Sequence, residues 1–184
     1  MTTLEKLIRI QVRMNQQANI AVSNALKTLS TEELTATRGA HKHYKSLIDL
    51  YRHLLMGNHF CFVDFAKVMP NASFTVKEFT FEDAAKFESV VDFDTIDKAL
   101  LQSDSEMVAA IESDISVVET DIHFFHHTKL ALEISGWWGH ACHHRGQISR
   151  ILDEMDVENN VFGNIVDYTT EDFKINGMEI FYNV

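Results

Sequence analysis

The chain has 184 residues, of which 46% are hydrophobic and 23% are charged, and no apolar run approaches the roughly 18 residues of a membrane span. We therefore predict a single globular domain over residues 1–184 that does not bind membranes. A formal net charge of -11 repels phosphate backbones and argues against a nucleic-acid partner. The polar start lacks the apolar block of a signal peptide, and two cysteines make no disulfide framework, so we expect a cytoplasmic protein.

The first predicted helix covers residues 4–29, where apolar side chains recur at steps of three and four. Thr2 and Glu5 are typical of a capping box at its start. Ser30 is predicted to cap a short further turn before the connector that contains Gly39. The positions of the predicted apolar stripe are Leu7, Met14, Ala18, Ala21, Ala25 and Leu29.

The second predicted helix runs from about Tyr44 to Val68 and stops before Pro70, which cannot continue the hydrogen-bond ladder. With Leu50 as the centre of its apolar stripe, His53 lies about 60° to one side and should face the core. His59 lies about 180° away and should face solvent. Residues 71–92 have no helical stripe and predict an extended crossover with a short strand.

Two further helices complete the predicted fold. The third begins near Asp94, a good N-cap, and the fourth covers residues 128–156. Beyond them, Asn176-Gly177 is typical of a type I′ turn in a small C-terminal hairpin. Four long helices with one long crossover between the second and third predict an all-α protein with the fold of a four-helix bundle.

A candidate metal site lies on the fourth helix. His140 and His144 are roughly 40° apart around the helix and one turn apart along it, so both imidazoles can reach one ion. Facing stripes bring His53 towards them from the second helix. Neutral imidazole suits divalent transition ions such as zinc and nickel. Three histidines with one open position are typical of a catalytic zinc-type site.

Side chains around this pair have predicted roles near the site. Gln147 lies on the ligand stripe and is predicted to orient a histidine or a bound water, or to pack as a plain polar side chain. His143 lies about 100° from His144 and should hydrogen-bond to a neighbouring helix instead of the ion. Trp137, one turn before His140, is predicted to pack in the core or to line the pocket.

Arg145 and Arg150 are predicted to project from flanking faces of the fourth helix and to pair with carboxylates there. A rival metal cluster lies just before this helix. His123, His126 and His127 repeat the spacing H-x-x-H-H, but no continuing apolar stripe turns them inward, and we predict a bystander or pocket-rim cluster.

The run His140-Ala141-Cys142-His143-His144-Arg145-Gly146-Gln147 resembles the H-x-x-H-H-R-G-Q signature of the DinB/YfiT-like superfamily of metalloproteins. Arg38-Gly39-Ala40 followed by Ser46-Leu47 resembles the R-G-A segment that leads into that family's second helix. Arg52-His53-Leu54-Leu55 resembles the segment that carries its first ligand. Arg52 and Gly139 stand where asparagine is frequent in the family.

This resemblance implies an up-up-down-down bundle that holds a metal through His53, His140 and His144, commonly as a homodimer. Some relatives are thiol S-transferases that use low-molecular-weight thiols. We therefore expect a metalloenzyme that activates a thiol or water for transfer to, or hydrolysis of, a small substrate. The alternative is a non-enzymatic stress-response or interaction dimer with a structural metal, which a closed coordination sphere would indicate.

Overall fold

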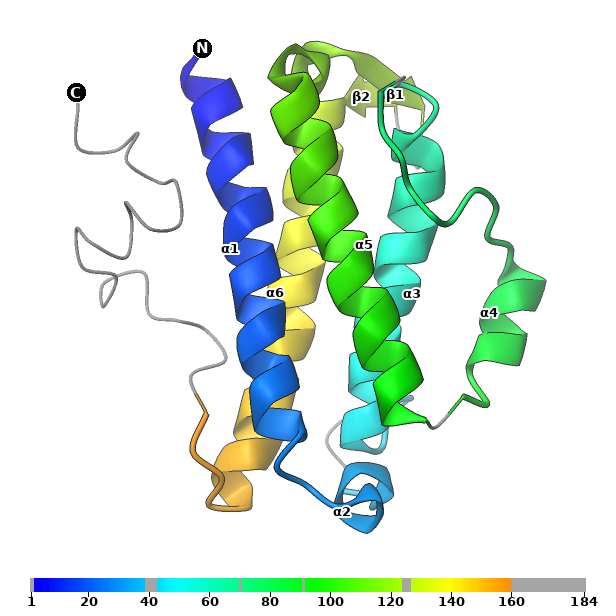
Figure 1. Ribbon diagram of the computed structural model, residues 1–184, viewed down its shortest axis with the longest axis vertical. Helices are drawn as coiled ribbons and strands as arrows, with labels where there is room; N and C mark the ends of the chain where they lie inside the picture. The colour runs from blue at the N-terminus through cyan, green and yellow to red at the C-terminus, as the bar shows by residue number, and fades with distance from the viewer. Residues whose placement is uncertain (1, 39–42, 70, 91, 124–126, 160–184) are drawn as a thin grey trace.

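The computed structural model describes residues 2–38, 43–69, 71–90, 92–123 and 127–159, and this part of the chain is predominantly helical, as expected for an all-α protein. Four long helices lie side by side (Figure 1), and they are α1 (Thr3–Leu26), α3 (Leu47–Phe65), α5 (Phe93–Ser113) and α6 (Leu130–Glu154). The shorter elements are α2 (Thr31–Thr35), α4 (Phe81–Phe87), the 3-10 helix η1 (Ile115–Glu119) and the strands β1 (Asp121–His123) and β2 (His127–Lys129). Within the described ranges, no helix combines the length and apolar character needed to cross a membrane.

Capping residues fix where the helices begin. The predicted capping box of Thr2 and Glu5 opens α1, and Ser30 caps α2 in the same way. Ser46 closes a further box, so α3 begins at Leu47 and not near residue 44 as predicted. Asp92 accepts the backbone N–H of residue 95 and starts α5 slightly before the predicted residue.

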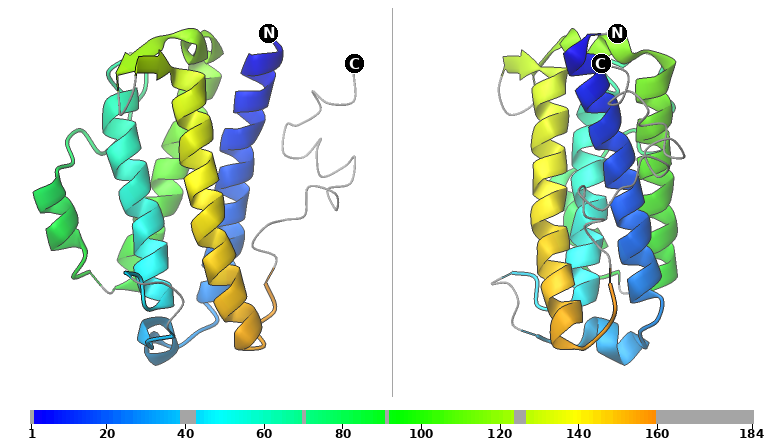
Figure 2. Two further views of the ribbon diagram at one scale, coloured as in Figure 1. Left: turned by 180° about the vertical axis from the view of Figure 1, so that it is seen from behind. Right: turned by 90° about the vertical axis from the view of Figure 1, so that its left-hand side faces the viewer.

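The directions of the long helices differ from the expected up-up-down-down order. α1 and α6 run one way while α3 and α5 run the other (Figures 1 and 2), which gives an up-down-down-up order. Lys27, which follows α1, accordingly pairs with Asp97 near the start of α5. α5 begins at the end of the molecule where α3 begins, so the two helices run parallel (Figure 1). Because α3 and α6 are antiparallel in either order, the correction leaves the two histidine-bearing helices facing as expected.

The buried face of α1 lies one residue away from the predicted stripe. Leu7 is 45% exposed, whereas Ile8 is fully buried. The inward positions of α1 include Asn15 and Asn19, which are 0% and 1% exposed. The stripe was predicted from apolar residues only, so Asn15 and Asn19 were left out of it. The prediction therefore chose the apolar residues next to the buried positions. The buried side chains along this face are Ile8, Val12, Asn15, Asn19, Val22 and Leu26.

A buried polar layer crosses the helices between two apolar clusters. Asp104 on α5 accepts hydrogen bonds from the amides of Asn15, Asn19 and Asn58, at 3.1, 2.7 and 3.0 Å. Arg145 on α6 donates to the side-chain carbonyls of Asn15 and Asn19, at 2.7 and 3.0 Å. Arg145 is only 1% exposed, so the prediction that it projects outward is wrong. Two buried asparagine carbonyls thus accept from one of its terminal nitrogens in place of surface carboxylates.

The crossover over residues 71–90 covers the outer face of α3. It contains the helix α4, capped by Thr80, and no strand is found among its described residues, contrary to the prediction. The rings of Phe79 and Phe87 lie 5.0 and 6.0 Å from that of His59. His59 is therefore partly buried and does not face solvent as predicted, and burial lowers its pKa.

One predicted segment is not described, and one short strand pair is present that the sequence did not predict. The predicted C-terminal hairpin around Asn176 lies outside the described residues. Strands β1 and β2 form an antiparallel pair in which His123 is opposite His127. They lie at the end of the molecule where α6 begins (Figure 1).

Candidate metal centre

Three histidine side chains converge between α3 and α6. The Nε2 atom of His140 lies 3.1 Å from Nε2 of His53 and 3.1 Å from Nε2 of His144. One ring nitrogen from each residue lies within 4.8 Å of those of the other two. Zinc bound at about 2.0–2.1 Å by tetrahedral ligands would place these nitrogens roughly 3.3 Å apart. The three histidines therefore lie close enough to bind one ion.

Hydrogen bonding alone satisfies this arrangement poorly. Each neutral imidazole has one N–H and one lone pair, and a single Nε2 of His140 faces two other ring nitrogens. It can donate its proton to one neighbour or offer one lone pair, but it cannot bond well to both. A cation accepts all three lone pairs at once. Burial, with a smaller contribution from His143, lowers the pKa of His140 and so favours the neutral form that binds metal.

Gln147 connects His144 to His143. Its Oε1 lies 2.8 Å from Nδ1 of His144, and its Nε2 lies 3.2 Å from Nε2 of His143. When Nδ1 of His144 donates to Oε1, the lone pair of Nε2 remains available to a metal. His143 is exposed and bonds within its own helix, so the predicted bond to a neighbouring helix is wrong. Its side chain points away from the other helices because it lies one residue off the inward stripe.

Tyr44 is a neighbour of the site that the sequence analysis missed. Its ring stacks on His53, with centroids 4.2 Å apart and planes inclined by 29°, and it meets His144 edge-on at 5.7 Å. Burial and the carboxylate of Glu88 raise the pKa of the Tyr44 phenol. Tyr44 precedes α3 and belongs to no periodic stripe, so the stripes could not place it near the site. The only sequence signal for its position is that it lies two residues before Ser46, the N-cap of α3.

The rival histidine cluster is described only in part. His123 is exposed on β1. Among the described side chains, His123 belongs to no group of three or more residues that could hold a metal ion. His126 lies outside the described residues. The strand pair places His123 opposite His127, in place of the helical spacing that the pattern H-x-x-H-H would have in a helix.

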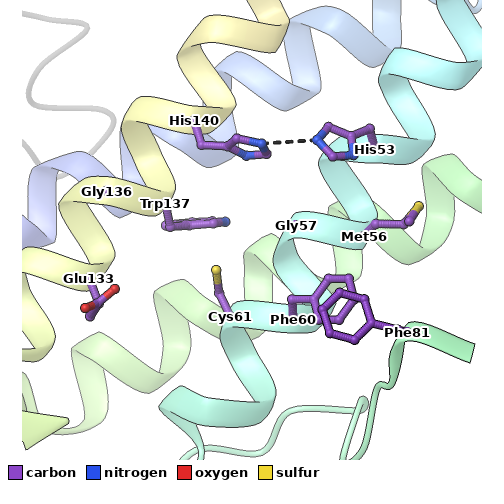
Figure 3. A pocket seen from close by; sticks show the side chains of 10 residues that line it. All are labelled: His53, Met56, Gly57, Phe60, Cys61, Phe81, Glu133, Gly136, Trp137 and His140. Atoms are coloured by element: carbon purple, nitrogen blue, oxygen red, sulfur yellow. Dashed lines mark hydrogen bonds between the residues drawn. The ribbon is translucent and has the colours of Figure 1, made fainter. Parts of the chain in front are cut away.

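An apolar pocket of about 390 Å³ extends from two of the three histidines (Figure 3). His53 and His140 lie at one end, and Cys61 and Glu133 lie towards the other. Trp137 lines it and is 5% exposed. Its indole N–H donates to Asn58 Oδ1 at 2.8 Å, so the indole belongs both to the pocket wall and to the core. The other residues that line the pocket are Met56, Gly57, Phe60, Phe81 and Gly136.

Comparison with family models, with curated proteins and with solved structures finds no match to this chain. The three converging histidines and the pocket beside them are the structural features that bear on function.

Proposed function

We propose that this chain is a DinB/YfiT-like four-helix-bundle metalloenzyme that holds zinc or nickel through His53, His140 and His144. The convergence of three imidazole nitrogens at the end of an apolar pocket carries the proposal. An ion bound there would act as a Lewis acid that lowers the pKa of a coordinated thiol or water. The reaction class that fits is transfer of a thiol to a small substrate, or hydrolysis of one.

The surrounding residues have distinct tasks in this proposal. Gln147 holds the tautomer of His144 through the bond to Nδ1. Tyr44 packs on His53 and fixes the plane of that ring. The apolar side chains of the pocket exclude water from the reacting groups, which strengthens electrostatic interactions within the site.

An open coordination position favours an enzyme over a structural metal site. Within the described residues, the ligand group contains three histidines and no fourth Cys, Asp or Glu. Structural zinc sites are usually closed by four protein ligands, whereas catalytic sites keep one position for water or substrate. The alternative function, a stress-response or interaction dimer with a structural metal, requires a fourth protein ligand.

Metal analysis of protein purified without a histidine tag tests the proposal. We expect about one zinc or nickel ion per chain in the wild type. His144→Ala should lose most of the metal. His143→Ala is the matched control, because that exposed residue neighbours the ligand but lies outside the group. Near-zero metal in the wild type, or equal metal in both variants, would contradict the proposal.

Two further parts of the proposal concern the assembly and location of the protein. We propose a homodimer, which is the common state implied by the family resemblance, and size-exclusion chromatography with light scattering would test it. We also propose a cytoplasmic location, which the free thiols of Cys61 and Cys142 support. Fractionation of the expressing cells would test this location.

A further inference from the structure

The pocket beside the histidines is formed by two facing helical stripes. α3 contributes His53, Gly57 and Cys61, and antiparallel α6 contributes Gly136 and His140. Cys61 follows His53 by eight positions on α3, and at about 1.5 Å per position the pocket follows the helix axis for roughly 12 Å. The space is therefore elongated, with the histidines at one end (Figure 3).

Glycines create part of this space. A Cβ built at Gly136 would meet no atom within 4 Å, so the backbone of α6 borders open pocket there. A glycine within a helix costs about 1 kcal/mol relative to alanine. Gly136 therefore lowers helix stability at a position where a side chain would occupy the pocket.

The outer rim carries an apolar side chain that the fold leaves in water. Phe81 on α4 is 85% exposed. Its ring lies 5.3 Å from that of Phe60 on α3. A bound apolar molecule would cover part of this exposed ring and so gain free energy from burial that the protein alone does not gain.

The far end of the pocket is negative and holds no reactive thiolate. Burial, assisted by the carboxylates of Glu133 and Asp64, raises the pKa of Cys61 to about 12. The Cys61 side chain is therefore a neutral wall at physiological pH. Glu133 is the charged group that lines this end, and it repels anions.

From these features we infer the substrate class of the site: an elongated small molecule with a metal-binding head, an apolar body and no negative charge at its far end. This inference rests on the proposed function for the head group, which the three histidines would meet through the ion. The body lies between α3 and α6, along Trp137 and Phe60, and under the exposed ring of Phe81.

Binding of alkanethiols to the zinc-loaded protein, measured by calorimetry, tests the inference. Each methylene that enters the pocket should tighten binding about fourfold, so hexane-1-thiol should bind roughly two orders of magnitude more tightly than ethanethiol. In Gly136→Leu this chain-length dependence should be lost. Gly139→Leu should retain it, because Gly139 resembles Gly136 in its exposure and in the open space around it but is not part of the pocket. Equal affinities for the two thiols in the wild type, or equal behaviour of the two variants, would overturn the inference.

The charge at the far end has its own test. 6-Aminohexane-1-thiol should bind at least about tenfold more tightly than 6-mercaptohexanoate, because only the carboxylate is repelled by Glu133. Glu133→Gln should remove most of this preference. Tighter binding of the carboxylate in the wild type would overturn the charge assignment.

Alcohols separate a failure of the inference from a failure of the metal proposal. His144 does not line the pocket, so His144→Ala should lose the ion and keep the apolar walls. Hexan-1-ol should still bind this variant far more tightly than ethanol does. If the wild type holds no metal and the alcohols show this difference, the proposed function fails and the apolar pocket stands. If metal binds and neither thiols nor alcohols depend on chain length, the inference fails alone.

Discussion

Replacement of Arg145 by methionine should strongly destabilise the protein. The guanidinium is 1% exposed and donates to two buried carbonyls, those of Asn15 and Asn19. Leaving each carbonyl without its donor costs about 1–3 kcal/mol. The buried carboxylate of Asp104 also loses its neighbouring positive charge. Breaking a buried charge network in this way typically costs about 3–5 kcal/mol, and methionine preserves much of the side-chain volume.

Urea denaturation followed by circular dichroism at pH 7 measures this effect. Arg150→Met is the matched control, because it is the same substitution on the same helix at an exposed side chain paired with Glu154. An exposed pair of this kind contributes less than about 0.5 kcal/mol. If Arg145→Met lowers the free energy of unfolding no more than Arg150→Met does, the hydrogen bonds of Arg145 in the polar layer do not stabilise the fold.

Three further predictions concern other parts of the molecule. Gln147→Leu should weaken zinc affinity by about tenfold or more without unfolding the protein, because His144 loses the partner of its Nδ1; competition with a chromophoric chelator would measure this, and an unchanged affinity would exclude an orienting role. Phe81→Ser should weaken hexane-1-thiol binding severalfold and leave the free energy of unfolding nearly unchanged, because the ring is 85% exposed; a large loss of stability would contradict this. Burial raises the pKa of Asp104 from 3.8 to about 6. The folded state therefore binds the carboxyl proton more tightly than the unfolded state does, which adds stability that is fully present below pH 3.8. This added stability is lost as the pH rises through about 6. The wild type should therefore lose roughly 2 kcal/mol relative to Asp104→Asn between pH 4 and pH 7; a constant difference in their free energies of unfolding would contradict it.

Helical phase predicted the convergence of His53, His140 and His144 better than it predicted the rest of the core. His140 and His144 share one helix, and their spacing determines that their side chains lie together whatever the tertiary structure. His53 needed only the position of an apolar stripe on the facing helix. Because α3 and α6 are antiparallel in both the expected and the observed order, the error in helix direction did not affect the three histidines.

The features that were mispredicted depend on contacts between distant segments. Arg145 and Asn15 are polar residues at buried positions, and hydrogen bonds to partners on other helices offset the cost of burying them. A hydrophobicity pattern cannot reveal a partner 130 residues away. His59 is covered by the crossover, whose path is not encoded in any local period.

X-ray absorption at the zinc and nickel edges, on untagged protein as purified, would show directly whether the three histidines hold a metal ion. We expect a bound ion with three imidazole nitrogens at about 2.0–2.1 Å and one exchangeable light ligand. On addition of hexane-1-thiol, that ligand should be replaced by sulfur at about 2.3 Å. Absence of a bound ion, or a closed sphere that does not change with the thiol, would contradict the account.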